Sequence, residues 1–230
     1  MEDEGRREEW PETIERFINF LVLKNGEKIP EKTVKKIRQY MLEFAVMPSM
    51  RFLWSAGPAA EKDNTVIYNC SFAKLNCVEA FAECLHILMC GTGFGFSVEE
   101  DEVSKLPSIP EIKSGKDIVR EVIDDSREGW ADSVKTLMTS LYDGQNLYFD
   151  YSQLRPEGAR LSTMGGRSSG PQPLIKLHDF IRETMHNAQG RKLTSLECHD
   201  IANQIAEIVV AGGVRRSSQI SLSDLNDEDM

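Results

Sequence analysis

Cysteine is the residue type in this sequence best suited to redox and radical chemistry, because its sulfur can give up a proton, an electron or a hydrogen atom. The five cysteines are Cys70, Cys77, Cys84, Cys90 and Cys198. No two of them form a CxxC pair, which disfavours a zinc site, and their odd number disfavours a framework of structural disulfides. Each is interpreted first as a small buried side chain, and Cys77 and Cys84, seven residues apart on one predicted helix, are expected in the core.

Cys70 stands apart from the others because of its local sequence. It lies in the segment YNCSF (68–72), inside a predicted strand. By contrast, CHD (198–200) cannot act as a catalytic triad, because adjacent residues of a helix do not face one another. The remaining histidines have no partners at metal-binding spacing, so the sequence predicts no metal site.

Three glycine-rich turns could present backbone N–H groups to a phosphate. The turn at 91–95 follows a helix and precedes a strand, the reverse of a dinucleotide fingerprint, so a tight turn is favoured there. The loop at 162–171 lacks the GK[ST] ending of a P-loop but offers hydroxyls and a guanidinium, so nucleotide binding and simple connection both stay open. The third turn places Arg215 and Arg216 at the start of a strand, where only one can face a ligand and the other can form a surface ion pair.

Hydrophobic periodicity indicates which elements must position these groups. Two helices are expected at 11–23 and from Pro30 to about residue 45, followed by a structured loop at 47–58. Thereafter strands and helices alternate. Strands are expected at 66–73, within 91–99, at 148–151 and at 214–222; helices are expected at 77–90, 116–142 with a break near Gly129, 174–188 and 195–211. This alternation predicts an α/β fold with a parallel sheet or barrel.

Composition excludes several classes of protein. Of 230 residues, 40% are hydrophobic and 28% charged, which is enough to fold one domain or one and a half. No apolar run approaches the roughly 18–20 residues of a membrane span, and the charged N-terminal segment is unlike a signal peptide, so we expect a cytoplasmic protein without membrane partners. The net charge of −10 disfavours binding to a nucleic-acid polymer, whereas residues 155–216, with nine basic and six acidic side chains, suit a small anionic ligand.

Six segments, in order along the chain, resemble the large catalytic subunit of ribonucleotide reductase, in particular the adenosylcobalamin-dependent class II type. They are MPSMRFLWSAG (47–57), YNCSF (68–72), CGTGFGFSVE (90–99), DSREGW (125–130), DYSQLRPEGARLSTMGGRSSGPQPL (150–174) and AGGVRRSSQISLSDLND (211–227). The resemblance implies that residues 47–230 form the first half of a ten-stranded α/β barrel, preceded by a helical N-terminal segment, residues 1–46.

Two departures from the family concern what the chain lacks. There is no NPCGE-like segment, so the thiyl-radical cysteine, its neighbouring glutamate and the second redox cysteine are expected in a separate C-terminal half. There is also no room for the N-terminal activity domain that some members carry, so no overall-activity switch is expected.

The resemblance also implies roles for particular residues. Cys70 matches one of the two cysteines that reduce the ribose at C2′ and end as a disulfide, after a thiyl radical has taken the C3′ hydrogen. Substrate contacts are implied for Ser49, Asn69 and Ser71, and phosphate or nucleotide contacts for Arg215 and Arg216. The loop formed by Gly165, Gly166, Arg167, Ser168, Ser169 and Gly170 matches one that relays effector identity, and the helix beginning at DSREGW matches one near the effector or dimer surface.

The implied cofactor is adenosylcobalamin, with a di-iron radical subunit as the alternative, and the implied reductant is a dithiol such as thioredoxin. The implied partners are the C-terminal half of the same enzyme, a ribonucleoside di- or triphosphate, a deoxynucleotide effector and a second copy of the chain in a homodimer. A non-catalytic nucleotide-binding or assembly module built on the same half-barrel is the alternative function.

Overall fold

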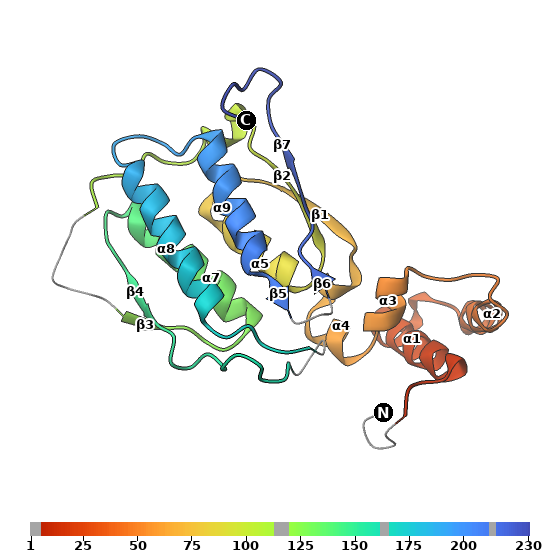
Figure 1. The fold of residues 1–230 in the computed structure, drawn as a ribbon. Helices are drawn as coiled ribbons and strands as arrows, with labels where there is room; N and C mark the ends of the chain where they lie inside the picture. The colour runs from red at the N-terminus through yellow and green to blue at the C-terminus, as the bar shows by residue number, and fades with distance from the viewer. Residues whose placement is uncertain (1–5, 113–119, 162–165, 212–214) are drawn as a thin grey trace. The chain divides into compact units, whose positions relative to one another are not determined.

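The computed structural model describes residues 6–112, 120–161, 166–211 and 215–230 (Figure 1). The chain divides into two compact units, Met1–Asn69 and Cys70–Met230. The domain boundary after residue 46, which was expected from the sequence, stays a prediction.

The first unit is built on a pair of helices, α1 (Trp10–Asn25) and α2 (Glu31–Leu42), joined by the short 3₁₀ turn η2 (Gly26–Lys28). Helix α1 begins with a capping box, in which the Glu9 and Glu12 side chains each accept a hydrogen bond from the other's backbone N–H. Its buried side chains repeat at helical spacing (Ile14, Phe17, Ile18 and Phe20) and form the face that packs within this unit. Both predicted helices are confirmed.

The predicted loop at 47–58 is wrong, because it contains the helix α3 (Met50–Ser55). The Ser49 hydroxyl accepts a hydrogen bond from the backbone N–H of Phe52 and caps this helix. The Phe52 ring meets the rings of Phe17 and Phe20 edge-on, at centroid distances of 5.0 and 5.9 Å. A polar cap and an aromatic contact therefore stabilise a helix of only six residues, which is too short to show a periodic pattern.

The unit ends with α4 (Pro58–Lys62) and the 3₁₀ turn η3 (Asn64–Ile67). The predicted strand at 66–73 therefore starts too early, since β1 covers Cys70–Lys74. Arg51, buried on α3, donates a hydrogen bond from Nη1 to the carbonyl of Val66 at 3.0 Å. That contact holds η3 against α3.

The second unit contains a three-stranded parallel sheet in the order β1-β2-β7, where β2 is Gly93–Ser97 and β7 is Gln219–Leu222. Its two smaller pairs are the parallel β3 (Arg120–Val122) with β4 (Tyr148–Asp150), and the antiparallel β5 (Val210–Ala211) with β6 (Arg215–Arg216). The predicted α/β fold with parallel strands is confirmed.

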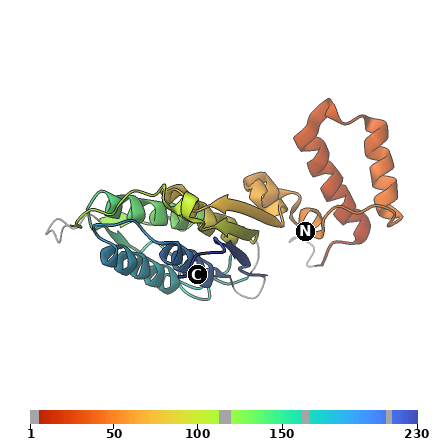
Figure 2. The same cartoon turned by 90° about the horizontal axis from the view of Figure 1, so that it is seen from above.

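Four long helices pack in a ring beside this sheet: α5 (Val78–Met89), α7 (Arg127–Tyr142), α8 (Gln172–Asn187) and α9 (Ser195–Ile208). Each contacts two others, in the cyclic order α5, α7, α8, α9, and the sheet lies against α5 and α9. Seen from above in Figure 2, the blue helices α8 and α9 form one layer and the green α7 lies in the layer beside them. One continuous apolar cluster joins these helices to the buried side chains of the strands.

Three sequence predictions in this unit are corrected. The expected helix 116–142 begins only at Arg127, where the Ser126 hydroxyl caps it, and residues 120–122 are a strand instead. The expected helix 195–211 ends at Ile208, and the expected strand 214–222 is divided into β6 and β7. The short helix α6 (Glu100–Val103) was not predicted.

Within the described residues, none of the helices has both the length and the apolar character needed to cross a membrane.

Gly129 is required at the start of α7 by a close approach of the backbone. A Cβ atom at this position would lie 2.4 Å from the carbonyl oxygen of Asp124. We therefore predict that Gly129→Ala lowers the free energy of unfolding by about 1–3 kcal/mol, although alanine has the higher helix propensity. Urea unfolding measures this change. Glu128→Ala, at the exposed neighbouring position, is the control and should change stability by less than about 0.5 kcal/mol; equal effects would refute the steric explanation.

Candidate active-site face

The sheet of the second unit has one face on the helices and one exposed face. Along β1 the exposed side chains alternate with half-buried ones, so Cys70, Phe72 and Lys74 point to the exposed face. The parallel register places Cys70 opposite Gly93, and Phe72 in one row with Gly95 and Ile220. We call this exposed surface of β1, β2 and β7 the open face.

The open face carries apolar side chains beside the thiol. Phe72 is 54% exposed, Ile220 63% and Leu222 45%. Between the first two lies Gly95, and a Cβ atom there would come within 3.2 Å of both neighbouring side chains. The glycine therefore lets Phe72 and Ile220 approach each other across β2, and the result is an apolar strip next to Cys70.

Cys70 is an exposed, free thiol at the start of β1. Cys84 and Cys198 are buried, and burial raises the pKa of each of these two thiols far above its ordinary value, so both remain protonated. An exposed thiol can form a disulfide with a second cysteine or donate a hydrogen atom to a ligand, whereas these two buried thiols are inert.

The prediction that Cys77 and Cys84 both lie in the core is half right. Cys84 is fully buried and accepts a hydrogen bond from Gln219 at 3.2 Å. Cys77 is exposed, because it precedes α5 as its N-cap residue, in an extended conformation, rather than lying on the helix face. The assumed helical spacing therefore did not apply to it.

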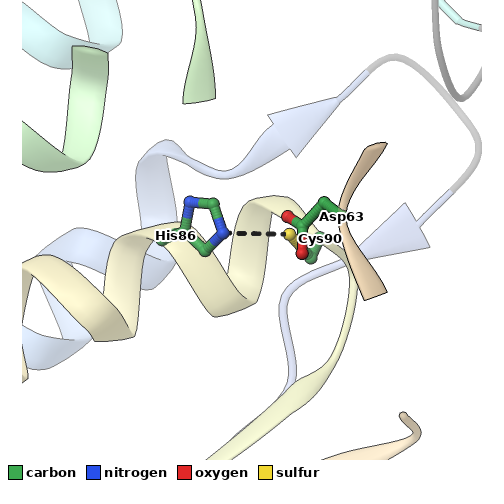
Figure 3. A group of neighbouring side chains, drawn as sticks. All are labelled: Asp63, His86 and Cys90. Carbon is green, nitrogen blue, oxygen red and sulfur yellow. Dashed lines mark hydrogen bonds between the residues drawn. The ribbon is translucent and has the colours of Figure 1, made fainter. Parts of the chain in front are cut away.

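Cys90, which follows α5, is buried and contacts two basic side chains. Its Sγ accepts a hydrogen bond from Nη1 of Arg127 at 3.0 Å and lies 3.7 Å from Nε2 of His86, one turn earlier (Figure 3). Asp63, drawn in the same figure, belongs to the other compact unit. Arg127 thereby links the start of α7 to the end of α5.

The three predicted substrate contacts are divided between the two compact units. Ser71 is half-buried, on the opposite side of β1 from Cys70, and its hydroxyl donates to the carbonyl of Gly93 at 2.9 Å. Ser49 caps α3, and Asn69 is the exposed last residue of the first unit. Their substrate roles stay predictions.

The predicted effector loop has the hydrogen bonds of a small hairpin. The N–H of Gly158 bonds to the carbonyl of Ser168, the N–H of Ser168 to that of Ala159, and the N–H of Leu161 to that of Gly166, at 2.8–3.1 Å. We call residues 158–168 the hairpin loop; its members 162–165, including the predicted Gly165, lie outside the described residues. The remaining predicted residues lie between the hairpin loop and α8. The Ser168 hydroxyl accepts a hydrogen bond from the N–H of Gly170, and Ser169 is half-buried.

The hairpin loop presents guanidinium groups. Arg160 and Arg167 are opposite each other in an antiparallel bridge, both exposed, and Arg167 donates from Nη1 to the carbonyl of Gly158 at 2.8 Å. Arg155, just before the loop, is paired with Asp125 at 2.7 Å. Like charges placed opposite each other repel, so an anion between Arg160 and Arg167 would stabilise the bridge.

Arg215 and Arg216 form β6, paired with β5. Their side chains lie outside the described part of the structure, so their predicted phosphate contacts stay predictions.

Sequence reasoning missed a buried polar group centred on His178 of α8. Its ring is fully buried and is hydrogen-bonded to Tyr151 and Ser133. The signal was available: His178 occupies the apolar face of α8, beside Leu174, Leu177 and Ile181, where a polar side chain needs a partner.

Comparisons with known proteins agree with the predicted family. Residues 99–185 match the family model described as the insertion domain of B12-dependent ribonucleotide reductase. The chain is 30% identical, over 244 residues, to the adenosylcobalamin-dependent ribonucleoside-triphosphate reductase of Euglena gracilis, with 96% of this chain and 33% of the relative covered. It is 28% identical to the enzyme of the same name from Lactobacillus gasseri, with 100% and 40% covered.

The fold agrees as well. A crystal structure of a B12-dependent (class II) ribonucleotide reductase superimposes with a TM-score of 0.84 at 24% identity, covering all of this chain and 40% of that one. The chain is similar to the N-terminal part of the class II ribonucleotide reductases. The resemblance predicted from the six sequence segments is confirmed. The chain spans between a third and two fifths of the length of these relatives.

The match to the reductase insertion domain locates that part of the family in this structure. It runs from Glu99, before α6, through α7, β4 and the hairpin loop to Met185 in α8. The open face with Cys70 lies outside this range, on strands that precede and follow it.

A buried carboxylate near the start of this range fixes the far end of β1. Glu102 of α6 accepts hydrogen bonds from Lys74, Lys105 and Asn76, the last two at 2.6 and 2.8 Å. These donors, Lys105 first, lower the pKa of Glu102 to about 2. Because Lys74 ends β1, the ion pair ties the strand to α6.

Glu102 should make stability depend on pH in a defined window. Its folded pKa is depressed from 4.5 to about 2, so its contribution is complete above pH 4.5 and is lost as the pH falls towards 2. Glu102→Gln should therefore lower the urea midpoint at pH 7, and this difference from the unmodified protein should shrink below pH 4.5. Glu100→Gln, on the exposed side of α6, is the control. A difference that does not change between pH 7 and pH 3 would contradict the assignment.

Proposed function

We propose that this chain is the N-terminal part of a ribonucleotide reductase and supplies one of its two reducing thiols, Cys70. The observation that carries the proposal is the position of this free, exposed thiol on the open face, in a chain similar along its whole length to named reductases. Their names favour ribonucleoside triphosphates over diphosphates as the substrate.

The proposed reaction replaces the 2′-hydroxyl of the ribose by hydrogen. The C2′–O bond breaks, the oxygen leaves as water, a C2′–H bond forms, and two thiols become one disulfide, so that two electrons and two protons balance the step. Cys70 is one of these thiols. Its partner, and the cysteine whose thiyl radical takes the C3′ hydrogen and later returns it, are contributed by the part of the enzyme beyond this chain. A dithiol such as thioredoxin then reduces the disulfide.

The apolar strip around Cys70 supports this assignment in two ways. Radical intermediates need a site from which water is excluded, and Phe72, Ile220 and Leu222 provide an apolar wall. A strip of this kind on one side of a sheet also favours burial by further protein. We infer that the C-terminal half of the enzyme covers it and completes the barrel.

Adenosylcobalamin is the proposed cofactor, as in the names of the relatives. When bound, it supplies the radical by cleavage of its cobalt–carbon bond. The open face carries the Cys70 thiol, apolar side chains and the ammonium group of Lys74, which is paired with Glu102. The thiol suits radical transfer and disulfide exchange, but these groups do not by themselves hold a corrin. We therefore assign none of these residues to cofactor binding; a di-iron radical subunit is the alternative.

The hairpin loop is proposed to take part in recognising a deoxynucleotide effector. The opposed guanidinium groups of Arg160 and Arg167 suit a phosphate, and Gly166 and Gly170 have positive φ angles of 93° and 72°, which favour glycine. The helix α7 that begins within DSREGW is proposed to lie near the effector or at the surface of a homodimer.

Cys70→Ser tests the proposal directly. With the segment that completes the length of the relatives, adenosylcobalamin, a dithiol and a ribonucleoside triphosphate, the unmodified protein should form deoxyribonucleotide over many turnovers. Cys70→Ser should reduce multiple turnover to background, because no disulfide can form at this position. Cys77→Ser is the matched control, since Cys77 is also exposed, and it should retain activity.

Each outcome of this experiment is informative. Undiminished turnover by Cys70→Ser would refute the role of Cys70. Nucleotide binding without reduction, equal in both variants, would instead favour the non-catalytic module. Equal thermal midpoints of the two variants would show that any difference arises from chemistry rather than from folding.

A further inference from the structure

A chain of hydrogen bonds crosses the interior of the second unit from β4 to α7. The Tyr151 hydroxyl lies 2.8 Å from Nδ1 of His178, and Nε2 of His178 lies 3.0 Å from the Ser133 hydroxyl. The Ser133 hydroxyl in turn donates to the carbonyl of Trp130 at 2.7 Å. His178 and Ser133 are buried, and Tyr151 is partly so.

The direction of these hydrogen bonds follows from counting protons. Ser133 has one hydroxyl hydrogen, which Trp130 receives, so Ser133 must accept from Nε2–H of His178. The neutral ring then has an acceptor at Nδ1, which receives the Tyr151 hydrogen. The bonds therefore run in one direction, from Tyr151 through His178 and Ser133 to the backbone of α7.

The surroundings keep both aromatic groups in the protonation states that this chain of bonds needs. Burial, with Arg182 nearby, lowers the pKa of His178 to about 3, so the ring is neutral at physiological pH. Burial also raises the pKa of Tyr151, which keeps its proton. The ring of Phe149 packs on the imidazole at a centroid distance of 4.7 Å.

The hydrogen bond between Tyr151 and His178 joins the two ends of the segment 151–178. Tyr151 is the first residue after β4, and His178 lies in the second turn of α8, which starts at Gln172; the hairpin loop is between them. One turn further along α8, Arg182 donates to the carbonyl of Leu147, just before β4. Helix α8 thus holds the chain on both sides of β4.

We propose that His178 is a positioning residue for effector recognition, which through its hydrogen bond to Tyr151 anchors the segment that leads into the hairpin loop. The inference rests on the proposed function, because it assigns the loop to an effector. Its physical reason is loop closure: the bond ties Tyr151, seven residues before Gly158, to helix α8, which follows the loop, and a loop that transmits the identity of a ligand needs anchored flanks.

Two variants separate this role from a general loss of stability. Tyr151→Phe removes the bond that anchors the segment before the hairpin loop, and Ser133→Ala removes the bond at the other side of the His178 ring. Each variant loses one hydroxyl from the same chain of bonds. Both should lower the thermal midpoint by similar amounts. Only Tyr151→Phe should impair effector recognition, whereas the rate of reduction without effector should be unchanged in both.

The measurement is the ratio of reduction rates of two competing ribonucleoside triphosphates, with and without a deoxynucleoside triphosphate, in the reconstituted enzyme. In Tyr151→Phe we expect the effector-induced change in this ratio to fall by about fivefold or more, the lower end of typical allosteric coupling. An unchanged effector response in Tyr151→Phe, or an equal loss in Ser133→Ala, would overturn the proposal.

Hydrogen exchange of the chain itself gives a second readout that does not need activity. The amides of Gly158, Leu161 and Ser168 are bonded inside the hairpin loop, and Tyr151→Phe should speed their exchange more than Ser133→Ala does. If the unmodified protein reduces no ribonucleotide, the proposed function and the effector role fail together, while exchange still decides whether His178 holds the loop. Equal exchange in both variants would refute that part.

Discussion

The one-sided burial of β2 is the constraint on which the rest of the second unit depends. Phe94 and Phe96 are 1% and 0% exposed, and they anchor the middle strand of the sheet to the helices, while Gly93 and Gly95 occupy its other side. Because side chains alternate along a strand, this choice decides which face of the neighbouring strands is exposed. The register Cys70 to Gly93 then places the thiol on the open face. A shift by one residue would turn Cys70 towards the helices and away from the open face.

Polar contacts on the helix side make such a shift costly. Gln219 of β7 donates to Cys84 of α5 and to the carbonyl of Ala202 in α9, and Ser221, two residues on, is hydrogen-bonded to His199. Apolar packing alone would tolerate some sliding of the strand, whereas these bonds would be broken inside the protein. The two edge strands are therefore held in place differently. Strand β7 is held by hydrogen bonds to α5 and α9, whereas β1 is held by the ion pair of Lys74 with Glu102.

The sequence predicted the elements whose stability comes from a periodic apolar face, such as α5 and α9, and its six ordered segments predicted the family. It failed where tertiary contacts decide. Helix α3 depends on the Ser49 cap and on Phe52 meeting two rings of α1, and neither contact has a periodic signature. The predicted helix at 116–142 overran a strand at 120–122 because local composition carries no information on β3 pairing with β4, whose residues lie more than twenty positions later. His178 was set aside because its partners, Tyr151 and Ser133, lie 27 and 45 residues away.

The residues proposed for chemistry and those proposed for positioning differ in how much of the fold depends on them. Cys70 is exposed and contributes nothing to the apolar cluster, so its replacement should leave folding intact. His178 is fully buried with both ring nitrogens bonded, so its removal would cost the Tyr151 and Ser133 hydroxyls one hydrogen bond each inside the protein. The helices thus hold the groups proposed for positioning, while the thiol lies on the exposed face of the sheet. In the proposed function, this separation would let another part of the enzyme complete the open face without changing the support beneath it.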